Sequence, residues 1–196
     1  MTELTGELPR LMICGYAQHG KDTFADYLVA CTNGLFSKWS SSVCAMEEAL
    51  LPYLYDYFPK ETADRYDTIY AEQGRQQVLD VMYSERGLHR QGWKDAITNY
   101  NDKDPTRLMK KLYEKSNIYV GIRSMREFQA GKDANLFDYS VWVEAPSKPV
   151  ETTCEIHKTD CQFIIENSGS LESLYTKAEL FASFINPDYR RPQSEV

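Results

Sequence analysis

Short apolar runs alternate with amphipathic stretches along the chain. Residues 11–14 form an apolar run that stops at Gly15, a pattern typical of a buried strand that enters a glycine turn. From Lys21 to Ala30, apolar residues recur at helical spacing. Strand, turn and helix therefore follow one another here, as they do at the opening of an α/β domain.

The middle third of the chain has mainly helical patterns. Segments 43–58, 68–86 and 105–116 are predicted to be helical, and residues 35–39 have the character of a short strand. No internal repeat or low-complexity segment interrupts this region.

The last third returns to alternating strands and helices. Residues 118–122, 139–143 and 163–165 are β-rich runs, and a helix is expected to start near Ser124. Residues 170–185 predict a closing amphipathic helix. Its expected buried side consists of Leu171, Leu174, Ala178, Phe181 and Ile185. Strands that alternate with helices indicate an α/β fold, in which a mostly parallel sheet is covered on both faces.

Composition favours one compact domain. Hydrophobic residues make up 42% of the 196 residues, and no Pro/Gly/Ser-rich linker divides the chain. The formal net charge of −7 disfavours non-specific binding to nucleic acid, so a polymer substrate would need a local basic groove. No run approaches the roughly 18 apolar residues that a membrane-spanning helix requires.

Cysteine usage and the N-terminus bear on the compartment. The five cysteines are an odd number without paired spacing, and no basic segment followed by an apolar run begins the chain. We therefore expect reduced thiols and a cytoplasmic protein. A weaker alternative is a zinc site made by Cys154, His157 and Cys161, although a closed structural site usually needs four ligands.

The strongest chemical signal is the sequence GYAQHGKDT over residues 15–23, which matches G-x-x-x-x-G-K. Gly15 lets the chain leave the strand sharply, and Gly20 lets the backbone approach phosphate oxygens. Lys21 is expected to reach the β- and γ-phosphates and to act in catalysis. The predicted nucleotide-binding residues are Gly15, Ala17, Gln18, His19, Gly20, Lys21, Asp22 and Thr23. The alternative is a glycine-terminated strand that carries a surface lysine.

Asp22 departs from this pattern, which normally has Ser or Thr directly after the lysine. A carboxylate at this position could hold Mg²⁺ directly or through water, so Asp22 is the predicted metal ligand. Thr23 could still donate its hydroxyl group to a phosphate.

These residues resemble the deoxynucleoside monophosphate kinases of bacteriophages, whose loop often reads G-K-D-T before a helix. Residues 74–79 and 86–93 are similar to the family's arginine-containing helical stretch that ends in a tryptophan. Residues 122–127 resemble its strand-end motif, and residues 160–174 resemble the strand-Asn-x-Gly-x-Leu ending shared with dephospho-coenzyme A kinases. The resemblance spans most of the chain, from Arg10 to Phe184.

The resemblance implies one P-loop kinase domain over residues 1–196 with a nucleoside-monophosphate-kinase-like fold. Its core would cover about residues 10–42 and 116–186, and its helical acceptor-binding region about 43–115. The irregular segment of about residues 145–160 would be a short lid. The resemblance also implies ATP and Mg²⁺ as cofactors, and the host cytoplasm as the location if a phage encodes the protein.

Arginines in the helical region are candidates for binding the acceptor. Arg75, Arg86 and Arg90 could clamp its phosphate, because a guanidinium group pairs two oxygens and stays charged. The alternative for each arginine alone is a solvated helix face, which is the more common case. Trp93 could stack on the base, as could Tyr83 and Tyr100, but ordinary core packing is an alternative for all of these aromatic residues.

Two further arginines follow a predicted sheet strand, where ligands bind in open α/β folds. Arg123 is a candidate catalytic residue, and Arg126 is a candidate for substrate binding. Glu127 could anchor these arginines, or simply favour the start of a helix. Gly121 stands where the resembled family usually has aspartate, so Asp22 or another acid would have to handle part of the metal binding.

The predicted lid carries Lys148 and Lys158 but no arginine. Lids of many related kinases supply arginines, so these lysines, or Arg123 and Arg126, would have to cover the phosphate charge.

The expected function is ATP-dependent transfer of a phosphoryl group to a deoxynucleoside monophosphate. Two alternatives remain open: the same nucleotide site with another acceptor, such as dephospho-coenzyme A or a hydroxymethylated base in DNA, and a nucleotide-binding switch that transfers nothing. The sequence also leaves open which base is accepted and whether the chain forms a homodimer.

Overall fold

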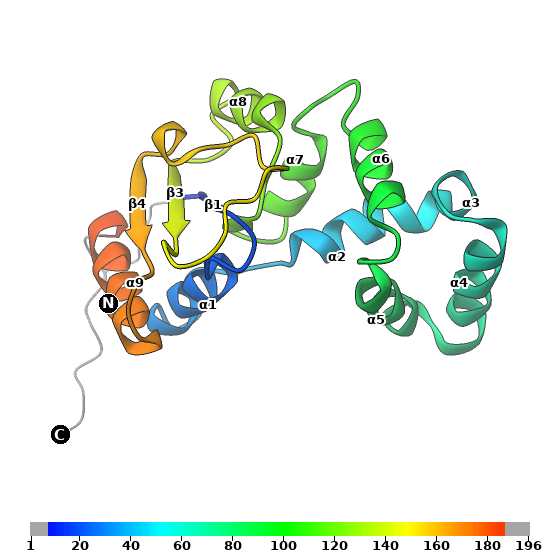
Figure 1. The fold of residues 1–196 in the computed structure, drawn as a ribbon, viewed down its shortest axis with the longest axis horizontal. Coiled ribbons are helices and arrows are strands. Elements are labelled where there is room, and N and C mark those ends of the chain that lie inside the picture. Colours follow the sequence, from blue (N-terminus) through cyan, green and yellow to red (C-terminus); the bar gives the residue numbers. More distant parts are fainter. Residues whose placement is uncertain (1–7, 187–196) are drawn as a thin grey trace. The chain divides into compact units, whose positions relative to one another are not determined.

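The computed structural model of the protein describes residues 8–186. Four parallel strands form a single sheet in the order β2-β1-β3-β4 (Figure 1). The strands are β1 (Leu11–Cys14), β2 (Ile118–Val120), β3 (Tyr139–Glu144) and β4 (Phe163–Glu166). The predicted α/β class is confirmed, and an all-parallel sheet flanked by helices is compatible with a P-loop fold.

One face of the sheet packs against the first and last helices. These are α1 (Lys21–Cys31) and α9 (Leu171–Ile185), which also pack against each other. Alternation along β1 directs Leu11 and Ile13 to this face, where both are fully buried. The main core of the protein lies here because the apolar stripes of both helices meet the same side of the strands.

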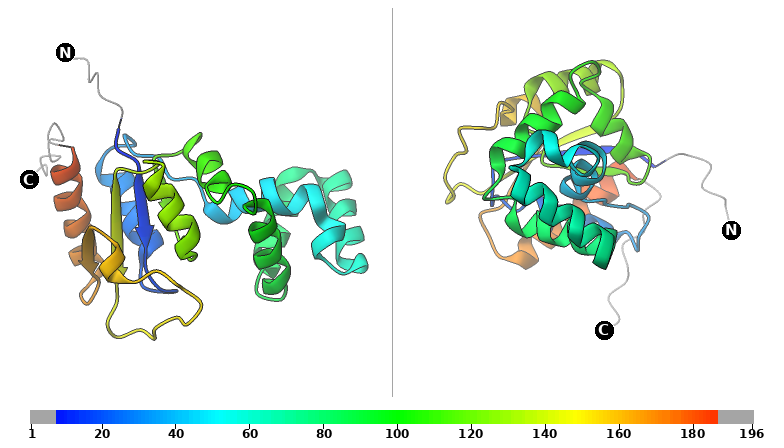
Figure 2. Two further views of the ribbon diagram at one scale, coloured as in Figure 1. Left: turned by 90° about the horizontal axis from the view of Figure 1, so that it is seen from above. Right: turned by 90° about the vertical axis from the view of Figure 1, so that its right-hand side faces the viewer.

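The other face is covered by different parts of the chain. Met12 and Cys14 alternate with the residues of the first face and are also fully buried. Helix α8 (Met125–Asp133) lies on this side, as a right-handed crossover from β2 to β3 requires (Figure 2). Residues 145–162, called the connection below, then return the chain from the end of β3 to the start of β4. Most of the connection is irregular, apart from the short helix η3 (Lys158–Asp160).

The predicted closing helix forms with nearly the expected bounds. The Ser170 hydroxyl group accepts a hydrogen bond from the Ser173 N–H and caps α9. Of its expected buried side, Leu174, Ala178, Phe181 and Ile185 are buried, but Leu171 is exposed. The prediction was wrong for Leu171, which is the first residue of the helix and makes no contribution to the core.

The chain divides into two compact units. The sheet unit comprises residues up to Trp39 and from Tyr113 onward, and the helical unit comprises Ser40–Leu112. These boundaries lie close to the limits predicted for the core and for the helical acceptor-binding region. The two units are described separately below.

The helical unit begins with a broken helical segment where one stretch, 43–58, was predicted. Pro52 lies inside it and lacks the N–H that a regular helix needs. The successive elements are α2 (Ser41–Ala45), the π-helical turn η1 (Met46–Leu50), η2 (Leu51–Tyr53) and α3 (Leu54–Tyr57).

The next segment corrects a second prediction. Residues 68–86 are not one helix, because α4 (Lys60–Gln73) ends and α5 (Arg75–Glu85) begins at Gly74. Gly74 has φ of 86° and ψ of 175°, a conformation that is essentially restricted to glycine and that a helix cannot continue through.

Two more helices complete the helical unit's sequence. Helix α6 (Arg90–Tyr100) was not predicted as a separate element, and α7 (Arg107–Tyr113) lies within the predicted segment 105–116. In the sheet unit, the strand expected at residues 35–39 is reduced to a single bridge between Lys38 and Ile118.

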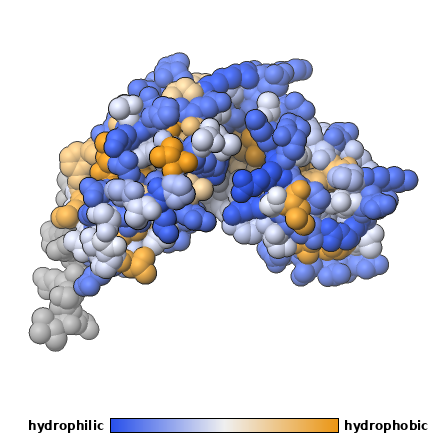
Figure 3. Space-filling model, viewed as in Figure 1, coloured by the Kyte–Doolittle hydropathy of each residue, from blue (hydrophilic) through white to orange (hydrophobic). Residues whose placement is uncertain are grey.

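The face drawn in Figure 3 is mainly hydrophilic, with small separate hydrophobic areas. Scattered apolar residues of this kind are ordinary on protein surfaces. Within residues 8–186, no helix combines the length and the apolar character needed to cross a membrane.

Candidate phosphate-binding site

The glycine-rich loop joins β1 to α1 at the carboxyl edge of the sheet, and two of its glycines are required by conformation. Gly15 has φ of 138° and Gly20 has φ of 91°. A Cβ atom at Gly15 would lie 2.3 Å from the Val143 carbonyl oxygen, and one at Gly20 would lie 2.4 Å from Asn167 Nδ2. Neither position can take a side chain without moving its neighbours. Gln18 also has a positive φ, 63°, so the loop turns sharply in the middle.

Lys21 is the first residue of α1 and lies against this loop. It is 8% exposed, and its Nζ donates a hydrogen bond to the Tyr16 carbonyl oxygen at 2.6 Å. Burial lowers the pKa of the Lys21 ammonium group, and the nearby positive charge of Arg123 lowers that pKa further. The lysine is therefore a partly desolvated cation at the positive end of a helix, where an anion would be favoured.

Asn167 holds the loop from the end of β4. Its side-chain Nδ2 donates to the His19 carbonyl oxygen at 3.1 Å, and its backbone N–H donates to the Glu144 carbonyl oxygen at 2.6 Å. This residue belongs to the strand-Asn-x-Gly-x-Leu ending noted in the sequence. Its role in fixing the loop was not predicted, because the two segments lie far apart in the chain.

The side chain of His19 links the loop to the connection. The imidazole is buried, and its Nδ1 accepts a hydrogen bond from the Ala145 N–H at 3.0 Å. Nδ1 therefore carries no proton, and Nε2 donates to the Pro149 carbonyl oxygen at 3.3 Å. His19 was predicted to bind nucleotide, and any such role falls to its backbone, since its ring joins the loop to the connection.

Asp22, the predicted metal ligand, points to a lysine. Its exposed carboxylate lies 3.5 Å from Lys38 Nζ, which also pairs with Asp26 at 2.7 Å. Among residues 8–186, no group of three or more His, Cys, Asp or Glu side chains is arranged to hold a metal ion. Cys154, His157 and Cys161, which were considered as a zinc site, therefore do not form such a group.

Gly121 occupies the place where the resembled family usually has aspartate. Its φ is 89°, which few residues other than glycine adopt, and its N–H donates to the Ile13 carbonyl oxygen at 2.9 Å. A Cβ atom built there would lie 4.0 Å from Lys21 Cε. Position 121 thus lies next to Lys21, and because it is glycine in this chain, it provides no carboxylate beside that lysine.

Arg123 pairs with an acid that the sequence did not single out. Its Nη1 forms an ion pair with Glu151 of the connection, and the Glu151 carboxylate also accepts the Ala17 N–H at 3.0 Å. Glu155 anchors the same region, since its carboxylate accepts the Met125 N–H at 2.9 Å and its own N–H donates to the Arg123 carbonyl oxygen. Arg123 therefore lies beside the loop, and its predicted contact with phosphate stays a prediction.

Three other residues predicted near the phosphates, Arg126, Glu127 and Lys158, lie on two different elements, α8 and η3. Ser124 caps α8 by accepting the Glu127 N–H, so Glu127 lies in the first turn of that helix and Arg126 precedes it. Lys158 of the connection pairs with Glu144 at the end of β3, at 3.1 Å.

Three of the arginines predicted to bind the acceptor, Arg75, Arg86 and Arg90, lie in the helical unit, and two of them make contacts within it. Arg75 pairs with Glu47 at 3.3 Å, and the Arg86 guanidinium group lies 4.2 Å from the centre of the Tyr83 ring. Arg90 is exposed at the start of α6.

Trp93 is buried in the helical unit, which agrees with the core-packing alternative. Stacking of Trp93 on a base stays a prediction, as does binding of an acceptor by Arg75, Arg86 and Arg90.

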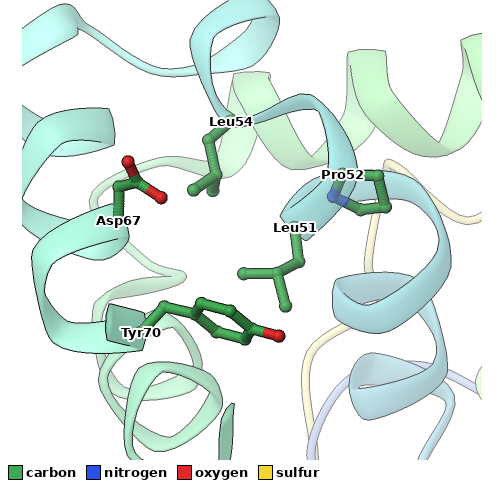
Figure 4. A pocket seen from close by; sticks show the side chains of 5 residues that line it. All are labelled: Leu51, Pro52, Leu54, Asp67 and Tyr70. Atoms are coloured by element: carbon green, nitrogen blue, oxygen red, sulfur yellow. The ribbon is translucent and has the colours of Figure 1, made fainter. Parts of the chain in front are cut away.

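Two hollows lie in the helical unit. The larger, about 290 Å³, is drawn in Figure 4, where the side chains of Leu51, Leu54 and Tyr70 face a shared space. A second, of about 190 Å³, includes Tyr100 and Arg107, whose guanidinium group lies 3.9 Å from the centre of the Tyr100 ring. Tyr100, a candidate for stacking on the base, therefore lines the second hollow, whereas Arg75, Arg86, Arg90 and Trp93 line neither.

Comparisons with models of known protein families and with curated protein sequences found no match. The chemistry assigned to this site therefore rests on its own residues and geometry.

Proposed function

We propose that the chain is an ATP-dependent phosphotransferase that moves the γ-phosphoryl group onto a deoxynucleoside 5′-monophosphate. One observation carries the proposal. A loop with two obligatory glycines and a buried lysine joins a central parallel strand to a helix N-terminus at the carboxyl edge of the sheet. That arrangement suits polyphosphate, because a glycine loop before a helix N-terminus can offer backbone N–H groups to an anion, and the ammonium group of Lys21 lies against the same loop.

The loop already binds an oxyanion within the chain. The Ala17 N–H donates to the carboxylate of Glu151, and Arg123 pairs with the same carboxylate. A phosphate oxygen offers the same kind of acceptor with more charge, which supports assigning these donors to phosphate.

In the proposed reaction, bound ATP supplies the phosphoryl group and Mg²⁺ neutralises charge on its phosphates. Lys21 stabilises the charge that moves from the transferred group toward the leaving phosphate, and Arg123 offers a second cation at the loop. The chain needs no nucleophile of its own, because the acceptor phosphate is already anionic at neutral pH.

The residues present fit a magnesium ion only in a limited way. Mg²⁺ bound to a nucleotide usually takes one or two protein carboxylates, with phosphates and water as its other ligands. Asp22 could serve as one of these after its carboxylate leaves Lys38, to which it now lies 3.5 Å away.

Assignment of the acceptor rests on the resemblance and on the arginines of the helical unit. Arg126 of the sheet unit stays a candidate for binding substrate, and in the proposed function Arg75, Arg86 and Arg90 orient the acceptor phosphate. Their present contacts with Glu47 and Tyr83 would have to be exchanged for contacts with the ligand.

An ADP-release assay with the natural and modified deoxynucleoside monophosphates tests the proposal. We expect magnesium-dependent turnover with at least one of them, and a diphosphate product identified by chromatography. Release of inorganic phosphate without a phosphorylated acceptor would indicate a switch instead. Turnover only with dephospho-coenzyme A or hydroxymethylated DNA would keep the nucleotide site and replace the acceptor.

A further inference from the structure

Glu151 is turned into the protein where a charged side chain would ordinarily face water. It lies in the connection, an irregular segment between β3 and β4, yet its side chain is only 17% exposed. The preceding Val150 is 67% exposed. Solvation alone would favour the reverse arrangement, so the contacts made by the carboxylate must offset its desolvation.

Those contacts are made with the groups assigned to phosphate. One carboxylate oxygen of Glu151 accepts the Ala17 N–H of the loop at 3.0 Å. The other pairs with Arg123 and accepts the Thr153 hydroxyl group at 2.8 Å. A backbone N–H of the glycine loop and the cation beside it therefore hold the same anionic group.

The lysine of the loop is also satisfied within the chain. Its ammonium group donates to the Tyr16 carbonyl oxygen at 2.6 Å, a bond that would be exchanged for phosphate oxygens. A loop N–H, Arg123 and Lys21 thus all have internal partners in this structure.

We propose that the Glu151 carboxylate is an internal competitor that occupies the phosphate-binding loop until a polyphosphate displaces it. The inference rests on the proposed function, since it takes the loop to be the phosphate site. Two like-charged groups cannot share the Ala17 N–H and Arg123 without strong repulsion, so nucleotide binding must expel the carboxylate. Because only molecules with a vacant loop bind, the apparent affinity is the intrinsic affinity multiplied by the fraction of molecules in which the loop is vacant.

This competition would set which anions the loop accepts. A polyphosphate carries several charges and meets several donors at once, so it can displace one carboxylate. Inorganic phosphate offers fewer contacts for the same displacement, so Glu151 would discriminate against it.

The rest of the connection has anchors that this exchange leaves intact. Glu155 binds the Met125 N–H, and Pro149 accepts a hydrogen bond from the His19 ring. Only the side chain of Glu151 and the residues next to it have to move. Glu155 also provides a matched control, because it is a carboxylate of the same segment that accepts a backbone N–H away from the loop.

Calorimetric titration of the wild type, Glu151→Ala and Glu155→Ala tests the proposal. The probes are magnesium ATP and inorganic tripolyphosphate, with inorganic phosphate for comparison. We expect Glu151→Ala to bind both polyphosphates about tenfold more tightly and to gain measurable affinity for phosphate, while Glu155→Ala matches the wild type. Equal or weaker binding by Glu151→Ala would overturn the proposal, and so would an equal gain in Glu155→Ala. Weaker binding of magnesium ATP alone would make Glu151 a metal ligand instead.

Hydrogen exchange separates this inference from the proposed function, because it needs no nucleotide. Glu151→Ala should speed exchange of the Ala17 amide, and Glu155→Ala should speed exchange of the Met125 amide instead. If the Ala17 amide is equally protected in Glu151→Ala and the wild type, the carboxylate is not its partner and the inference fails. If that amide responds as expected but neither protein binds any polyphosphate, the proposed function fails and the competitor role with it.

Discussion

The candidate ligand-binding groups of the sheet unit and of the helical unit differ in kind. In the sheet unit, the donors belong to the backbone of a loop whose shape is enforced by Gly15 and Gly20, and the cation Lys21 is 8% exposed. In the helical unit, the candidate donors are long side chains on helix surfaces, and that of Arg75 is 55% exposed. The backbone fixes the shape of the first arrangement, although its Ala17 N–H now binds Glu151, whereas the second depends on side chains that can take several rotamers.

The difference has an energetic consequence. Fixing a rotamer-rich side chain in a binding geometry costs on the order of 1 kcal/mol, and a backbone N–H in a rigid loop avoids that cost. Arg75 must also leave Glu47 before it can bind a phosphate. We therefore expect changes in the loop to affect chemistry and binding strongly, and changes in the arginines to affect acceptor affinity more moderately.

The largest effect is expected from Lys21→Ala. Removing the ammonium group should lower the rate of phosphoryl transfer by about 10²- to 10³-fold, because a positioned cation stabilises the moving charge in a partly desolvated site. Steady-state kinetics with saturating ATP measures this loss, and circular dichroism checks the fold. Lys177→Ala on α9 is the control and should keep full activity. Undiminished turnover in Lys21→Ala would remove this lysine from catalysis.

Alanine substitution of one glycine in each unit, Gly20 and Gly74, compares the two units directly. Gly20→Ala should lower the free energy of unfolding by about 1–3 kcal/mol and abolish nucleotide binding, because φ of 91° is strained for alanine and the new methyl group meets Asn167. Gly74→Ala is also strained, because φ of 86° with ψ of 175° is essentially restricted to glycine, but no atom lies within 4 Å of the new methyl group. It should lose at least as much stability and keep its nucleotide affinity. Urea unfolding and calorimetry measure the two quantities, and equal loss of binding in both variants would contradict the distinction.

A smaller effect is expected from Arg75→Ala. If this arginine orients the acceptor phosphate, the KM for the deoxynucleoside monophosphate should rise about tenfold while the KM for ATP stays unchanged. Arg65→Ala is a matched control, because Arg65 is also a helix arginine paired with a glutamate, Glu85, in the same unit. A similar rise in Arg65→Ala would indicate general damage to the helices and not loss of an acceptor contact.

The smallest effect is expected on stability, from loss of the Asp104 carboxylate in the helical unit. The ion pair and hydrogen bond with Lys110, together with hydrogen bonds from Thr106, lower the pKa of Asp104 to about 2. A lowered carboxyl pKa contributes stability above the usual value of 3.8, and this contribution is lost as the pH falls toward 2. Because the carboxylate is well exposed, Asp104→Asn should cost less than about 1 kcal/mol at pH 7. Urea unfolding should show the difference from the wild type narrowing below pH 4, whereas a constant difference would exclude the ionised carboxylate as its cause.

Features governed by neighbouring residues were predicted well. Apolar runs that end in turn residues predicted all four strands, and Ser124 and Ser170 marked the starts of α8 and α9. The spacing of Gly15, Gly20 and Lys21 indicated a loop in which both glycines do have positive φ. These signals are readable because local sterics and local hydrogen bonds set the backbone conformation.

Boundaries inside the helical unit were less predictable. The break at Gly74 was missed because an isolated glycine is tolerated in many helices, and only its actual φ and ψ show that the chain turns there. Leu171 matched the apolar spacing of α9 but lies at the helix end, outside the packed core.

The parts of the site that come from distant segments could not be inferred from pattern. Glu151 reaches Ala17 across 134 positions, and Asn167 reaches His19 across 148. No spacing rule links such residues, because the parallel sheet brings their strands together at one edge and the connection then lays Glu151 on the loop. Local chemistry therefore specified a turn suited to an anion. Long-range packing decided that the Glu151 carboxylate binds there and that Asp22 lies beside Lys38. Packing decides these contacts because burial and charge pairing depend on neighbours that are distant in the chain.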